Sequence, residues 1–220
     1  MAIRRTILVV EPGFQDAKEP ILKAILEVPN TNVVLACGLN TVVNYDWLKK
    51  YKCDTILFDY KKNDLLKKVR DYEKNIHYKI NGVTTWIDTS VQTAIEIQLA
   101  LKLPPVTLLK KNLLTNKFEC RKKLKKQKAD STWFHAITHT IRPSDLKLLE
   151  KKLPLICKPT EMMASLGVQL VKNKKDILIA AQQNLSIDFT GEDLRKIYPN
   201  IKRQVIFEEV LKGTEMSVES

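Results

Sequence analysis

Residues 153–171 read LPLICKPTEMMASLGVQLV, a pattern that predicts a strand, a loop and a second strand. The apolar run up to Cys157 is typical of a buried strand, and Pro159 ends it because proline cannot donate a ladder hydrogen bond. Polar and small residues follow before a second strand at 167–171. Lys158 therefore stands at a strand end beside a flexible loop, where an ammonium group can hold a phosphate. The alternative is an ordinary hydrated lysine, which is the more frequent case for a lone strand-end lysine.

A second informative segment is VIFEEVLKGTE, residues 205–215. The strand pattern places Glu208 at the end of an apolar run, and a glycine further on allows a tight reversal. Extended backbone at Val210 and Leu211, next to a carboxylate, matches the donor and acceptor edge of adenine. Glu215 can accept hydrogen bonds from ribose hydroxyls. The alternative is an edge strand followed by a charged turn.

The first hundred residues alternate between strand and helix patterns. Residues 6–10 are a continuous apolar run, which is typical of a strand buried on both faces, and NVVLACG at 32–38 and DTILFDY at 54–60 predict a second and a third strand. Apolar stripes at helical spacing lie between and after these runs. The alternation predicts an α/β fold with a parallel sheet and crossover helices.

A domain boundary is expected at the pair Pro104 and Pro105, because two consecutive prolines cannot continue a helix. We therefore predict a first domain over residues 1–103 and a second over residues 104–220. The second domain begins with a basic helix and contains both segments described above.

The 37 Lys and Arg residues outnumber the 25 Asp and Glu residues, and the net charge of +12 favours a polyanionic partner. Ten of the basic residues and one acid lie between Lys102 and Lys128. A nucleic-acid binder is one interpretation, although Phe118 is the one aromatic residue within that stretch that could stack on a base. We favour a hydrated helix face.

Several classes of protein are excluded by composition. No apolar run reaches the roughly 18 to 20 residues of a membrane span, and the N-terminal residues do not form a secretory signal. The four cysteines never form a CxxC pair, which favours free thiols in a reducing compartment. We therefore expect a folded cytoplasmic protein that does not enter a membrane.

His135 and His139 have the spacing that places two metal ligands on one face of a helix. The β-forming residues around them predict an extended segment instead. We therefore expect ordinary histidines and no metal site here.

The order of these segments resembles the ATP-grasp superfamily of carboxylate-amine and carboxylate-thiol ligases, which includes L-amino acid ligases and biotin carboxylases. Four stretches within residues 80–215 carry the resemblance: INGVTTWIDTSVQTAIEIQLALKLPP, TNKFECRKKL, LPLICKPTEMMASLGVQLV and VIFEEVLKGTE. Each is weak alone, but their order and spacing are specific. The resemblance implies an α/β protein with a Rossmann-like pre-ATP-grasp domain, followed by an incomplete α+β ATP-grasp domain.

The resemblance implies a phosphate-binding half of the site. Lys117 and Lys158 match the two lysines that neutralise the ATP phosphates, and Ser165 lies in the loop that closes over them. The loop reads EMMAS where relatives are usually glycine-rich, and Asn116 replaces the usual acid before the first lysine. Bulky side chains restrict close approach of the loop backbone to phosphate.

The resemblance also implies a nucleoside-binding half. Glu208 matches the acceptor for the adenine amino group, Val210 and Leu211 match the hinge backbone beside the ring, and Glu215 matches the ribose ligand. ATP and Mg²⁺ are the implied cofactors, with the magnesium ligands and the catalytic groups expected beyond Ser220. Residues 1–220 alone are therefore expected to be inactive.

The function expected for the whole protein is ATP-dependent ligation, in which a carboxylate is activated as an acyl phosphate and then attacked by an amine. The alternatives are a biotin carboxylase-like enzyme and a non-catalytic module that binds nucleotides or nucleic acid. The expected partners are ATP and a small carboxylate substrate, with homodimer formation left open. Nucleic acid and membranes are not expected as partners.

Overall fold

The computed structural model describes residues 5–13, 15–39, 42–76, 78–104, 112–162, 165–186 and 203–214. The described residues form two compact units, one up to Thr115 and one from Asn116 onward. The boundary proposed after Leu103 stays a prediction, because residues 105–111 lie outside the described part.

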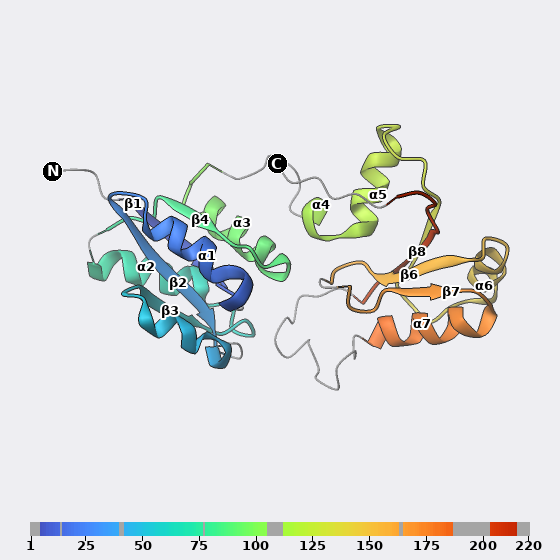
Figure 1. Ribbon diagram of the computed structural model, residues 1–220, viewed down its shortest axis with the longest axis horizontal. Helices are drawn as coiled ribbons and strands as arrows, with labels where there is room; N and C mark the ends of the chain where they lie inside the picture. The colour runs from blue at the N-terminus through green and yellow to red at the C-terminus, as the bar shows by residue number, and fades with distance from the viewer. Residues whose placement is uncertain are drawn as a thin grey trace. The chain divides into compact units, whose positions relative to one another are not determined.

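The first unit is a four-stranded parallel sheet with helices on both faces (Figure 1). Its strands lie in the order β3-β2-β1-β4. The elements in chain order are β1 (Arg5–Val10), α1 (Gln15–Leu26), β2 (Thr31–Gly38), the 3₁₀ segment η1 (Val42–Lys50), β3 (Asp54–Phe58), α2 (Leu65–Ile76), β4 (Gly82–Thr84), the 3₁₀ turn η2 (Asp88–Ser90), α3 (Val91–Ala100) and α4 (Asn112–Thr115).

Neighbouring residues of β1 are buried in different clusters. Leu8 and Val10 pack with side chains of α2 and α3, whereas Val9 packs with side chains of α1 and η1. A strand buried on both faces cannot alternate between apolar and polar residues, which explains the continuous apolar runs in the sequence. The predicted parallel sheet with crossover helices is therefore confirmed.

Glu11 is a fully buried carboxylate directly after β1. It accepts a hydrogen bond from the Gly38 N–H at 3.0 Å and another from the Tyr45 hydroxyl. Burial, together with the charge of Glu11, raises the pKa of the neighbouring Cys37 thiol to about 12. These contacts join the ends of β1 and β2 to η1, so Glu11 has a structural role.

The second unit contains a four-stranded antiparallel sheet in the order β5-β8-β6-β7. Its elements in chain order are α5 (Lys117–Lys126), β5 (Phe134–Ile137), α6 (Pro143–Glu150), β6 (Leu155–Pro159), β7 (Gln169–Val171), α7 (Lys174–Ser186) and β8 (Val205–Glu209). Among the helices in the described segments, none is both long and apolar enough to span a bilayer.

The two faces of this sheet differ. Alternate side chains of its strands, such as Leu155 and Phe207, form a core with α6 and α7. Their strand neighbours point to the other face, where Phe118 of α5 packs edge-on against Phe134 of β5 with ring centroids 5.9 Å apart. Figure 1 shows α7 and α5 on opposite sides of the strands. Helix α5 therefore covers part of the second face, and a pocket lies beside it.

Candidate functional site

Lys158 lies on the face of the sheet opposite the core of the second unit. Leu155 and Cys157 are fully buried with α7, so the period of two along β6 turns Ile156 and Lys158 to the other face. The Lys158 side chain is 19% exposed. The strand thus delivers an ammonium group to a partly desolvated position.

Lys117 reaches the same region from the start of α5. The Asn116 side chain caps this helix by accepting a hydrogen bond from the Glu119 N–H at 3.0 Å. The Lys117 N–H donates to the Thr160 carbonyl at 2.9 Å, and Lys117 Nζ donates to the Met162 carbonyl at 2.7 Å. These bonds tie the first turn of α5 to the segment that follows β6.

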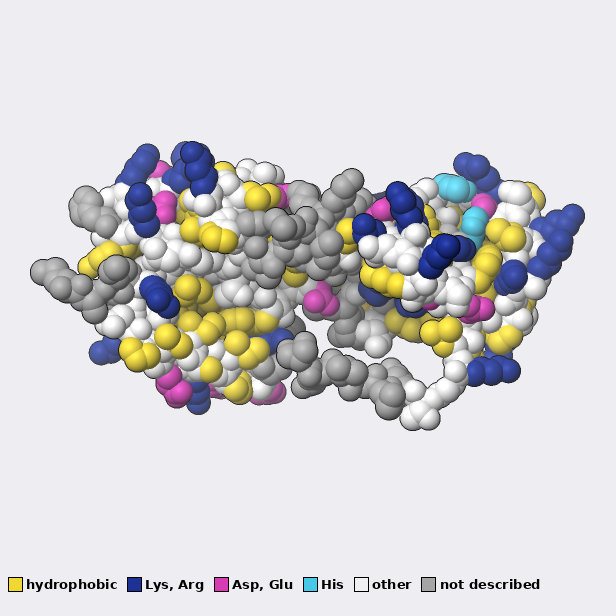
Figure 2. Space-filling model, turned by 90° about the horizontal axis from the view of Figure 1, so that it is seen from above, with side chains coloured by type: hydrophobic (Ala, Val, Ile, Leu, Met, Phe, Trp, Pro, Cys, Tyr) yellow, Lys and Arg dark blue, Asp and Glu magenta, His cyan; other side chains and the backbone are white. Residues whose placement is uncertain are grey.

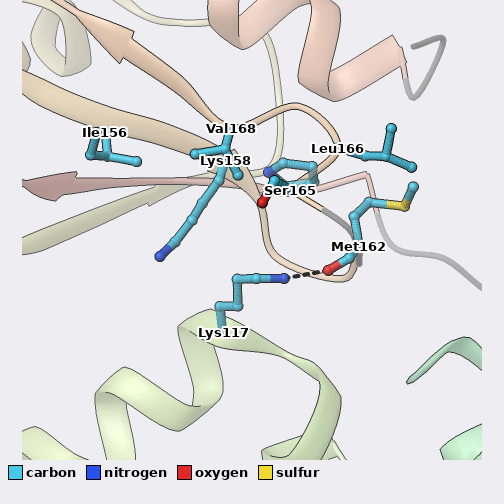
Figure 3. Close-up of a pocket in the computed structure, with 8 residues that line it drawn as sticks. Lys117, Ile156, Lys158, Met162, Ser165, Leu166 and Val168 are labelled. Atoms are coloured by element: carbon cyan, nitrogen blue, oxygen red, sulfur yellow. Dashed lines mark hydrogen bonds between the residues drawn. The ribbon is translucent and has the colours of Figure 1, made fainter. Parts of the chain in front are cut away.

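A pocket of about 320 Å³ brings the two predicted lysines together (Figure 3). In Figure 3 the side chain of Lys117 rises from α5 and turns to the Met162 carbonyl, and that of Lys158 extends from β6 on the side where α5 lies. Ser165 lines the same pocket. The remaining lining residues are mainly apolar: Ile156, Pro159, Met162, Leu166 and Val168. Two cations in a pocket with apolar walls favour an anionic ligand.

The loop between β6 and β7 is anchored at its second end. Ser165 has a φ of +56° and Gly167 a φ of +74°, and the turn is closed by a hydrogen bond from the Val168 N–H to the Ser165 carbonyl at 3.1 Å. Asn184, fully buried on α7, donates to the Gly167 carbonyl at 2.9 Å. The loop therefore presents Ser165 from a fixed turn.

Glu208 contacts the phosphate-binding half of the predicted site. It lies opposite Ile156 in the β6–β8 pairing, and its Oε2 is 2.5 Å from Lys158 Nζ. The Arg121 Nε donates to Glu208 Oε1 at 2.8 Å. Burial by itself would raise the pKa of Glu208, but hydrogen bonds from Arg121 and Lys158 and their charges outweigh burial and hold the pKa below its usual value. Glu208 is therefore an ionised hydrogen-bond acceptor.

The predicted hinge after β8 does not line the pocket. Val210 and Leu211 directly follow β8, and neither is among the residues that line the pocket. Leu211 is 65% exposed. Glu215, the predicted ribose ligand, lies outside the described residues. The structure thus brings Lys117, Lys158 and Ser165 together, with Glu208 adjoining them.

Sequence reasoning missed Arg121, which pairs with both Glu208 and Asp130. The residue lies in the stretch TNKFECRKKL that carries the resemblance, but it was given no role in the site. Its spacing from Lys117 was the available signal, because residues four apart on a helix lie on the same face. The helix that carries one lysine of the predicted phosphate site therefore also carries the partner of the predicted adenine acceptor.

Two histidines of the second unit lie beside a single carboxylate. His135 Nε2 lies 3.1 Å from one oxygen of Asp145, and His139 Nε2 lies 3.4 Å from the other. Within the described ranges, no group of three or more His, Cys, Asp or Glu side chains is placed to hold a metal ion. No step below passes through a metal ion.

Asn116 stands where the resemblance leads one to expect an acid, and its contacts explain why an amide is found there. This side chain is 1% exposed, and its amide donates to Glu161 Oε1 at 2.7 Å while its oxygen accepts from the Glu119 N–H. An amide can do both, whereas a carboxylate can accept only. An aspartate here would place two buried carboxylates in contact.

The substitution Asn116→Asp is therefore expected to lower the free energy of unfolding at pH 7 by about 1–3 kcal/mol, because Glu161 loses a donor and faces a like charge. Urea unfolding at pH 7 measures the loss. Asn173→Asp is the matched control, because Asn173 also accepts a helix N–H but is exposed. Equal stability of the two variants at pH 7 would contradict this explanation.

Both the sequence and the fold resemble those of known proteins. Residues 151–220 match the sequence family of the ATP-grasp domain. The chain also has the fold of solved ATP-grasp enzymes, with a parallel sheet followed by an antiparallel one. The resemblance to the ATP-grasp superfamily and the predicted fold class are thereby confirmed.

Particular solved structures show how far the likeness extends. An L-amino acid ligase from Bacillus licheniformis matches with a TM-score of 0.69 and 16% identity, covering 97% of this chain and 48% of that one. A D-alanine–D-alanine ligase from Bacillus anthracis matches with a TM-score of 0.57 and 15% identity, covering 95% and 58%.

The biotin carboxylase domain of a 2-oxoglutarate carboxylase from Hydrogenobacter thermophilus, in complex with MgADP, ADP and bicarbonate, matches with a TM-score of 0.62 and 10% identity, covering 96% and 45%. The chain thus spans about half the length of the solved structures that it matches. No curated protein sequence matches significantly. At these identities the likeness establishes the fold.

Proposed function

We propose that the chain provides the phosphate-binding part of an ATP-dependent ligase, which activates a carboxylate as an acyl phosphate for attack by an amine. One observation carries the proposal: Lys117 and Lys158 approach a single pocket from two different elements, and Glu208 adjoins Lys158. A triphosphate needs positive charge from more than one direction, and this pocket supplies it.

The proposed reaction has two steps. A carboxylate oxygen of the substrate attacks the γ-phosphorus of ATP, and ADP leaves. The amine nitrogen then attacks the acyl carbon, and phosphate leaves as the amine loses a proton. Negative charge shifts over the phosphate oxygens in the first step, so ammonium groups that are fixed beforehand stabilise its transition state. Lys117 and Lys158 have this role in the proposal, and Ser165 closes the loop beside them.

The nucleoside half of the proposal rests on Glu208. Because Glu208 is ionised, it accepts hydrogen bonds, and the adenine amino group is a donor. The backbone of Val210 and Leu211 is assigned to the ring edge, and Glu215 to the ribose. All of these assignments remain part of the proposal.

The proposal also covers the cofactors, the substrate and the compartment of the protein. The MgADP bound to the biotin carboxylase domain supports Mg²⁺ and ATP as cofactors. A small carboxylate is the proposed substrate, with bicarbonate the alternative if the protein is biotin carboxylase-like. A homodimer is compatible with the proposal. All four cysteines are free thiols, which supports a reducing, cytoplasmic location.

A nucleic-acid-binding function is less well supported. Lys122 lies 5.1 Å from the ring centroid of Phe118, and Lys125 lies 5.4 Å from that of Phe134, so lysines cover both rings of the α5 surface. Bases stack on open aromatic faces. On the face seen in Figure 2, Lys and Arg side chains are spread over both units instead of forming one patch.

A thermal-shift titration with ATP, ADP and a short oligonucleotide tests the proposal. We expect ATP and ADP to raise the melting temperature, because a ligand at about 100 times its dissociation constant adds roughly 2.7 kcal/mol of stability. The oligonucleotide should have little effect. Stabilisation by the oligonucleotide that falls steeply with salt, together with no response to ATP, would favour the nucleic-acid binder instead.

A further inference from the structure

Four charged side chains form a continuous chain from the turn after α5 to the pocket. Asp130 pairs with the guanidinium of Arg121, whose Nε donates to Glu208 Oε1 at 2.8 Å. Glu208 Oε2 is in turn 2.5 Å from Lys158 Nζ. The two acids and two bases are 6–23% exposed, so solvent screens these contacts only partly.

Arg121 is held firmly enough to orient its neighbour. The carboxylate of Asp130 also accepts a hydrogen bond from the Thr132 N–H at 2.8 Å, which fixes it to the turn before β5. Hydrogen bonding to Glu208, followed by that to Asp130, raises the pKa of the Arg121 guanidinium, whereas burial opposes the shift. The planar guanidinium fork therefore reaches Glu208 from a fixed position.

Two side chains compete for the Glu208 carboxylate, Arg121 from α5 and Lys158 from β6. Its neighbour across the ladder in β5 is Phe134, which carries no charge. If Lys158 turned to a phosphate, Arg121 would keep Glu208 ionised and in place. Without Arg121, the carboxylate would follow the Lys158 ammonium group and lose its orientation.

We infer that Arg121 is a positioning residue that selects the nucleobase: it holds Glu208 as a fixed acceptor, so that the site takes adenine in preference to guanine. This inference rests on the proposed function, since it assigns a role in the same ATP site. Adenine presents an amino donor at the position where guanine presents a carbonyl acceptor. A fixed, ionised acceptor therefore accepts the first base and repels the second, and a site that hydrogen-bonds a substrate group discriminates strongly against analogues that lack it.

The test compares the dissociation constants of ATP and GTP by NMR titration of the 220-residue chain. In Arg121→Ala we expect the affinity for ATP to fall about tenfold, because one hydrogen bond to a charged group loses its geometry. The affinity for GTP should change much less, so the preference for ATP falls by a similar factor. Arg121→Lys should recover part of the preference, since it keeps the charge but not the fork.

Two further variants make the result specific. Lys123→Ala on the exposed side of α5 removes the same charge without touching Glu208, and it should leave the preference unchanged. Arg121→Met keeps an apolar stem and replaces the alanine variant if that variant does not fold.

The outcomes separate the role of Arg121 in base selection from the proposed ATP site itself. If the Arg121 variants bind ATP and GTP with the same ratio as Lys123→Ala, the role of Arg121 is wrong, while the proposed ATP site stands. An equal loss of affinity for both nucleotides would show a general structural or electrostatic role, and it would also overturn base selection. If the unmodified chain binds neither nucleotide, the proposed function itself fails.

Discussion

Replacement of Lys158 by alanine is expected to raise the dissociation constant of ATP by about 10- to 100-fold, the range for losing a hydrogen bond to a charged group. Lys158 is one of two ammonium groups in the pocket, and it is mostly withdrawn from solvent. Its attraction to phosphate is therefore screened less than that of a surface lysine. Isothermal titration calorimetry with ATP measures the change.

The matched control for this prediction is Lys151→Ala, which removes an exposed charge from the turn after α6. It should bind ATP as the unmodified chain does. AMP provides a second control, because it lacks the β- and γ-phosphates and should lose less affinity on removal of Lys158. Unchanged ATP affinity in a folded Lys158→Ala variant would refute the assigned role.

Replacement of Glu208 by leucine is expected to lower the free energy of unfolding by about 3 kcal/mol, the lower end of the range for breaking a buried ion pair. The substitution leaves the Arg121 and Lys158 cations facing each other without the carboxylate between them. Arg121 keeps Asp130 as a partner, which limits the loss. Urea unfolding measures the difference.

The matched control is Glu209→Leu, at the exposed neighbouring position, which loses a single hydrogen bond from the Trp133 N–H and should cost about 1 kcal/mol. The triple variant Arg121→Met, Glu208→Leu, Lys158→Met should recover much of the lost stability, because it leaves no unpaired charge. A Glu208→Leu variant as stable as Glu209→Leu would contradict the account of this ion-pair network.

The same network sets a dependence on pH. The pKa of Glu208 is held below its ordinary value of 4.5, so its contribution to stability is complete above that pH and is lost as the pH falls through the lower pKa of the folded state. Glu208→Leu should therefore show a shallower loss of stability in acid than the unmodified chain.

Much of the fold could be predicted from local pattern. Strands buried on both faces require continuous apolar runs, so residues 6–10 and 32–38 predicted the parallel sheet. The order of the second sheet was not predicted, because β8 lies between β5 and β6 although it is last in sequence. Such pairing depends on contacts between distant segments, which local periodicity does not encode.

Part of the candidate site was predicted from the sequence, and part was not. The resemblance assigned Lys158 and Glu208 to one site, and the β6–β8 register places Glu208 opposite Ile156, on the same face as Lys158. Arg121 lies 87 residues from Glu208, so its spacing from Lys117 gives its helix face but does not reveal its partner. The Asn116 amide is needed as a donor because of Glu161, which comes from a different segment of the chain. Residues whose roles depend on a partner from a distant segment were therefore the ones that sequence reasoning missed.

A crystal structure of the chain with a non-hydrolysable ATP analogue tests the central claim most directly. The account predicts phosphate oxygens within hydrogen-bonding distance of both Lys117 and Lys158, and the adenine amino group on Glu208. A nucleotide bound elsewhere on the chain, with neither lysine in contact with its phosphates, would contradict it.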